Sequence, residues 1–91
     1  MTETIFAFSC IVHTIQAEQN LLKAGLQVSV MPLPPTIRAG CWMCLRLPLL
    51  QTHDAEISLQ ESGITPHQIY TRTEENGHSV FSIVKREGNG K

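Results

Sequence analysis

The sequence predicts an α+β protein: a ferredoxin-like βαββαβ sandwich with antiparallel sheet order 4-1-3-2 and an added C-terminal hairpin strand. Its 91 residues, 42% of them hydrophobic, suffice for one domain with a small core. Ala17 precedes Gly25 by eight residues, and Ala55 precedes Gly63 by the same interval, so a weak repeat indicates two similar strand–helix–strand halves. Right-handed crossovers would place both helices on one face of the sheet.

The first half is expected to contain two strands around one helix. Residues 4–11 are β-branched and aromatic, with Phe6, Phe8 and Cys10 on one face, which places Cys10 in the core. A helix is expected to follow from about Thr14, a weak N-cap, and residues 26–31 form the second strand. The helix would end at Gly25 and bury an apolar stripe of Ile15, Leu21 and Leu22.

The second half begins after a stiff connection, since residues 32–36 hold three prolines. A third strand is expected over 41–47, a helix from Thr52 to Gly63, and a fourth strand over 67–73. In the third strand, Met43, Leu45 and Leu47 would face one side, and Trp42, Cys44 and Arg46 the other. That second face would be uncovered and would carry Trp42, Cys44, Arg46 and Tyr70.

The chain ends in a predicted hairpin. Asn76-Gly77 is the strongest turn signal and leads into a fifth strand over 80–84, outside the fourth. Residues 1–87 would form the single domain, and 88–91 a disordered tail. The strand after the turn holds Val80, Phe81, Ile83 and Val84 and would lie at a sheet edge, so it predicts a homodimer. The hairpin would pack against its copy or against the partner's sheet face, with Phe81 and Ile83 dominating the contact.

Composition excludes several classes of partner. The net charge is −1 and only 16% of residues are charged, which gives no general field for nucleic acid or an anionic membrane and indicates a surface partly covered by a partner. No apolar run is long enough for a membrane span, and the acidic start, residues 1–4, lacks a signal peptide's basic region. We therefore expect a cytoplasmic protein with reduced thiols.

Candidate chemistry centres on Arg38-Ala39-Gly40-Cys41. The small Ala39-Gly40 pair would allow close approach to Cys41, and Arg38 could stabilise its thiolate, the nucleophilic form. Spacing alone favours the alternative, a small buried residue at the start of a strand.

Cys41 and Cys44 also form a Cys-x-x-Cys pair, the pattern of a dithiol oxidoreductase. Residues three apart on a strand face opposite sides, so we expect no disulfide between them unless Cys41 lies outside the strand. The histidines have no metal-pair spacing and no glycine-rich phosphate loop is present, so neither a metal nor a cofactor is expected. The four histidines are His13, His53, His67 and His78.

A family resemblance rests on Ala17-Glu18, Leu21-Leu22-Lys23-x-Gly25, Pro32-x-Pro34 with Cys41 after six further residues, and Leu45-Arg46. Over residues 5–70 the chain resembles the selenium/sulfur carrier-like family of small bacterial proteins. The resemblance implies a carrier whose cysteine holds sulfur or selenium as a persulfide or selenosulfide, and only Cys41 matches that cysteine. The chain departs from the family pattern at Pro35 (usually Arg), Arg38 (usually Ser) and Trp42 (usually Gly).

The leading prediction is thus a carrier that uses Cys41, with donor and acceptor proteins as partners. Whether such a protein is an enzyme stays open. The alternatives are a non-catalytic interaction or dimerisation module that uses the open sheet face, and an oxidoreductase that uses Cys41 and Cys44.

Overall fold

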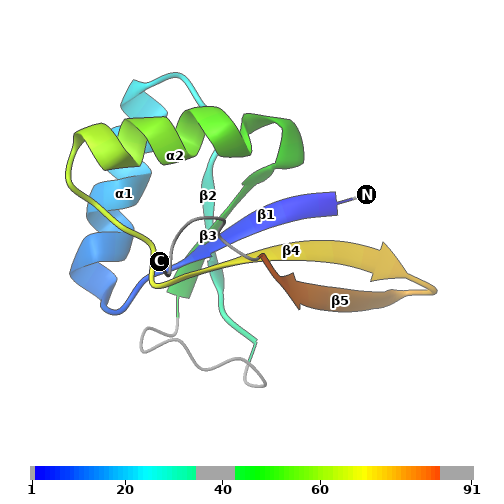
Figure 1. Cartoon of the computed structure of the whole chain (residues 1–91). Coiled ribbons are helices and arrows are strands. Elements are labelled where there is room, and N and C mark those ends of the chain that lie inside the picture. Colours follow the sequence, from blue (N-terminus) through cyan, green and yellow to red (C-terminus); the bar gives the residue numbers. More distant parts are fainter. Residues whose placement is uncertain (1, 35–42, 85–91) are drawn as a thin grey trace, which may run out of the picture.

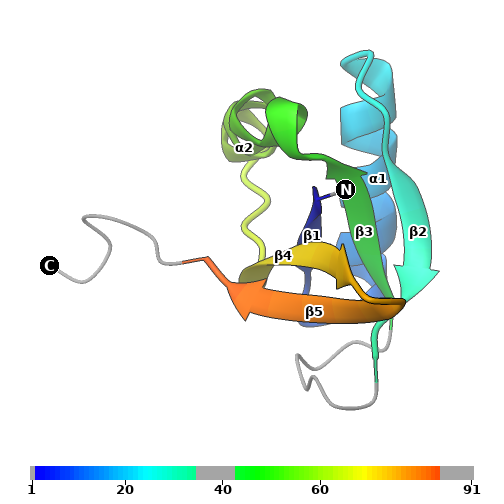
Figure 2. The same ribbon diagram turned by 90° about the vertical axis from the view of Figure 1, so that its right-hand side faces the viewer.

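Two helices lie on one face of a five-stranded antiparallel sheet in this computed structural model, which describes residues 2–34 and 43–84 (Figures 1 and 2). The expectations for residues 35–42 and for the tail, 88–91, lie outside that part of the chain. The elements are β1 (Thr2–Ala7), α1 (Ile11–Lys23), β2 (Ser29–Pro32), β3 (Met43–Pro48), the 3₁₀ turn η1 (Leu49–Gln51), α2 (Thr52–Glu61), β4 (Gln68–Glu75) and β5 (His78–Ile83).

The strand order is β2-β3-β1-β4-β5. Read from the other edge, this confirms the predicted order 4-1-3-2 with the fifth strand outside the fourth. The hairpin turn is confirmed as well, because Asn76 and Gly77 have φ of 53° and 80°. Two consecutive positive φ angles are what a two-residue type I′ turn requires.

The main core lies between the sheet and the helices. Phe6 and Phe8 are fully buried there and meet edge to face, with ring centroids 6.5 Å apart. Leu45 and Leu47 also point to this side, as the alternation in β3 predicts. The other buried members are Ala17, Leu21, Val28, Ala55, Leu59 and Ile69.

Helix α1 begins earlier than expected. Its N-cap is Cys10, in an extended conformation, and the helix proper starts at Ile11. Thr14 is therefore inside the helix, buried, with its hydroxyl donating to the carbonyl of Cys10 at 3.1 Å. The prediction of Cys10 as a core residue of strand one was wrong: β1 ends at Ala7, and Cys10 is half-buried where the chain leaves the sheet.

The buried stripe of α1 was also predicted wrongly in part. The helix buries Thr14, Ala17 and Leu21, while Ile15 and Leu22 are 45% and 51% exposed. Small side chains at positions 14 and 17 allow the helix to approach the sheet closely, which turns the larger side chains to its flank.

The face without helices is not uncovered, which corrects the prediction. Cys44 and Tyr70 do lie on that face, but Cys44 is fully buried and Tyr70 is 8% exposed. They belong to a second cluster, here called the rear cluster, and Met31 and Phe81 pack against its edge. The rear cluster consists of Ile5, Ala7, Leu33, Cys44 and Tyr70.

Ion pairs border the rear cluster. Glu3 on β1 lies between two arginines, with Oε2 at 3.5 Å from Arg46 on β3 and Oε1 at 3.4 Å from Arg72 on β4. Arg46 is exposed, as predicted for this face, whereas Trp42 lies outside the described residues. The polar part of this face is therefore limited to the rim, and its middle is apolar.

Truncation of a core residue tests the main core. Leu45→Ala is expected to lower the free energy of unfolding by about 2–5 kcal/mol, because Leu45 is fully buried between sheet and helices. Leu50→Ala is the matched control, since Leu50 is 96% exposed and its truncation should change stability by less than about 0.5 kcal/mol. Urea denaturation measures both, and equal losses would contradict the assigned core.

Candidate functional site

The ends of four strands, β1 to β4, and the start of α1 meet at one end of the sheet, here called the α1 end. β1 finishes there, with Ala7 opposite Cys44, and β2 finishes there, with Pro32 opposite Met43. The first turn of α1 follows four residues after Ala7 and lies at the same end (Figure 1). The chain leaves β2 and enters β3 at this end, so residues 35–42 join two neighbouring strand ends.

The predicted site residues Arg38 and Cys41 lie outside the described residues, together with Pro35 and Trp42. In the sequence, Cys41 precedes Met43, the first residue of β3, by two residues.

The incoming side of that segment is anchored by Leu33. This residue follows β2 directly and is 9% exposed within the rear cluster. Prolines flank it on both sides, which restricts the backbone there. Leu33 is not singled out by the sequence analysis; the available signal was a large apolar residue between two prolines.

The outgoing side is anchored by Cys44. Its side chain is fully buried in the rear cluster, and Sγ donates to the carbonyl of Met31 on β2 at 3.5 Å. Cys44 is directly opposite Met31 in the sheet, so the thiol reinforces the contact between β2 and β3. Cys44 therefore contributes to the packing of the sheet. A redox cycle between Cys41 and Cys44 would require this buried thiol to become accessible to solvent.

The N-terminus of α1 is the electrostatic feature of the α1 end. Cys10 makes no side-chain cap in the described structure, and the first turn holds no acidic residue. The first backbone N–H groups of a helix point outward and its dipole is positive there. This end of the sheet therefore favours an anion over a cation.

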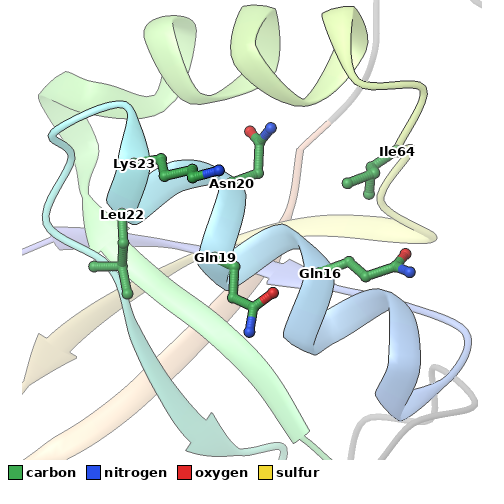
Figure 3. A pocket seen from close by; sticks show the side chains of 6 residues that line it. All are labelled: Gln16, Gln19, Asn20, Leu22, Lys23 and Ile64. Atoms are coloured by element: carbon green, nitrogen blue, oxygen red, sulfur yellow. The ribbon is translucent and has the colours of Figure 1, made fainter.

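Other surface features do not extend this site. A shallow depression lies on the outer side of α1, lined by Gln16, Gln19, Asn20, Leu22, Lys23 and Ile64 (Figure 3). Its amide side chains lack a nucleophile, and Asn20 accepts a hydrogen bond from Ser58 at 2.7 Å, which links α1 to α2. Across the described ranges no group of three His, Cys, Asp or Glu residues is placed to bind a metal.

Neither helix of residues 2–34 and 43–84 has both the length and the apolar character that a membrane span requires.

Thiol accessibility tests the assigned positions of two cysteines. In the native protein, iodoacetamide is expected to modify the half-buried Cys10 at a measurable rate and Cys44 only after unfolding, because Cys44 is fully buried. Peptide mapping after timed quenching gives both rates, and the same reaction in urea provides the control in which both thiols react. Equal rates in the native state would contradict the buried anchor.

One comparison with known proteins identifies the family. The family model described as "Putative Se/S carrier protein-like" matches residues 3–71, which covers most of the chain. No curated protein and no solved structure gave a match. The matched range includes α1, the Pro32–Pro34 connection and Cys41, and it ends within β4. The chain therefore belongs to the Se/S carrier protein-like family.

Proposed function

We propose that the protein carries sulfur or selenium on Cys41, as a persulfide or selenosulfide, between a donor and an acceptor protein in the cytoplasm. Family membership supports the class of function. The observation that carries the assignment to Cys41 is the pair of buried anchors, Leu33 and Cys44, on either side of residues 35–42. A cysteine attached between two fixed points can be offered repeatedly to two different partners.

The proposed loading step is a thiolate exchange. The Cys41 thiolate attacks the outer sulfur of a donor persulfide, and a new S–S bond forms between that sulfur and Cys41. The S–S bond of the donor breaks and its cysteine leaves as a thiolate, so no external oxidant or reductant is needed. Selenium follows the same route when the outer atom of the donor is selenium.

Electrostatics at the α1 end supports this step. The uncapped N-terminus of α1 favours negative charge at the end of the sheet where β3 begins, two residues after Cys41 in the sequence. Arg38, three residues before Cys41, is assigned as a second thiolate stabiliser. A cation near a thiol lowers its pKa, which raises the thiolate fraction at neutral pH.

Two other functions compete with this proposal. A dithiol oxidoreductase would need Cys44 as the second thiol, and its burial in the rear cluster disfavours that role. A module that binds through the open sheet face loses its proposed surface, because Tyr70 and Cys44 are buried there. The carrier function requires neither an open sheet face nor Cys44 as a second thiol.

Sulfur loading tests the proposal. After incubation with a cysteine desulfurase and cysteine, the intact mass is expected to increase by one sulfur, which reduction removes. Cys41→Ser should abolish this gain, whereas Cys10→Ser should keep it, because Cys10 lies at the N-cap rather than between the anchors. The assignment would be contradicted if Cys41→Ser still gained sulfur. It would also be contradicted if Cys10→Ser failed to gain sulfur while Cys41→Ser gained it.

Arg38→Gln adds a pH readout to the same assay. Loss of the cation should raise the pKa of the Cys41 thiol, so loading slows at neutral pH and recovers as the pH rises. If Arg38→Gln loads sulfur at the native rate at every pH, Arg38 does not stabilise the thiolate, and the role proposed for Cys41 is unaffected.

A further inference from the structure

β5 lies outside the residues that the family model matches. The family match ends at residue 71, within β4, and β5 spans His78–Ile83. Without β5, β4 would be the edge strand, and its outer half contains Arg72, Glu74 and Glu75. Charged side chains protect an edge strand from pairing with another chain. β5, the edge strand of the sheet, instead contains no Asp, Glu, Lys, Arg or proline, so it lacks this protection.

The backbone directions in β5 follow from its pairing with β4. Val84 N–H donates to the Ile69 carbonyl at 2.9 Å, directly after the strand. In an antiparallel pair, hydrogen-bonding residues alternate along each strand. Residues 78, 80 and 82 therefore bond inward to β4, and the N–H and C=O groups of Ser79, Phe81 and Ile83 point outward. Within the described part of the chain, no strand pairs with that outer edge.

We propose that β5 pairs antiparallel with β5 of a second copy of this chain, about a two-fold axis at Phe81. In this register Phe81 is opposite the same residue of the second copy, and Ser79 is opposite Ile83. Each of these is a hydrogen-bonded pair, so all three outward-pointing residues of both strands gain partners. An axis at Val80 would pair only Ser79 and Phe81, which makes the Phe81 register the better one.

The side chains fit this register. Opposed residues of an antiparallel pair share a face, so Val80 meets Ser82 on the helix side, and Ile83 meets Ser79 on the rear side. Val80 is 40% exposed and Ile83 is 64% exposed in the single chain, so both have apolar surface to bury. No like charges are opposed, because β5 is uncharged.

The size of the contact sets its strength. Stable protein interfaces bury about 1,200–2,000 Å² in total, more than one pair of six-residue strands provides. We therefore expect a dimer that dissociates on dilution. The contact is at the opposite sheet edge from β2, and the proposal does not depend on the proposed function.

The test is sedimentation velocity of the full chain over a concentration series, with two variants at position 79. Ser79→Pro removes one outward N–H without removing an inward bond, and proline is tolerated where an edge N–H faces solvent. Two intermolecular hydrogen bonds are lost per dimer, so the dissociation constant should rise about tenfold. Ser79→Ala keeps the N–H and is the matched control, with an unchanged dissociation constant.

Ile83→Lys is the second variant, because it places a charge on the outer edge at an exposed position and spares the core. It should be monomeric while keeping the circular dichroism spectrum of the native chain. A native chain that stays monomeric at about 100 μM, where a weak interface of this class should associate, would overturn the proposal. A dimer that persists in folded Ser79→Pro and Ile83→Lys alike would also overturn it, by placing the contact elsewhere.

Discussion

The burial of the rear cluster is the constraint on which the rest of the structure depends. Without it, the sheet would have one packed face and one open face, and the connection after β2 would have no fixed point. Leu33 and Cys44 contribute to this cluster from the two sides of residues 35–42, and Ile5 and Tyr70 complete it from β1 and β4. This hydrophobic cluster therefore stabilises the second face and anchors the chain where it leaves β2 and where it enters β3.

The two edges of the sheet then have different roles. The β2 edge is short, ends in Pro32, and adjoins the α1 end, where the proposed cargo chemistry takes place. The β5 edge is longer and neutral and lies on the opposite side of the sheet from β2, with β3, β1 and β4 between them.

Strand order and the hairpin were predictable because they depend on local signals: alternation in β3, the repeat around Ala17 and Ala55, and the Asn76-Gly77 turn. The start of α1 was not predictable from Thr14, because Cys10 is a poor N-cap residue and the cap is set by where the chain leaves the sheet. Burial of Cys44 and Tyr70 was missed for a related reason. Alternation shows which face a side chain occupies, whereas Leu33, a loop residue, closes the cluster only in three dimensions.

Hydrogen exchange in Leu33→Ala tests the anchoring role of the rear cluster most directly. Truncation of this anchor should increase amide exchange in β2 and in the first half of β3, while α2, which packs on the other face, keeps its protection. Val12→Ala, at a 55% exposed position on α1, is the control and should leave exchange unchanged throughout. Unchanged exchange in β2 and β3, or an equal increase in α2, would contradict the claim that Leu33 anchors the chain where it leaves β2.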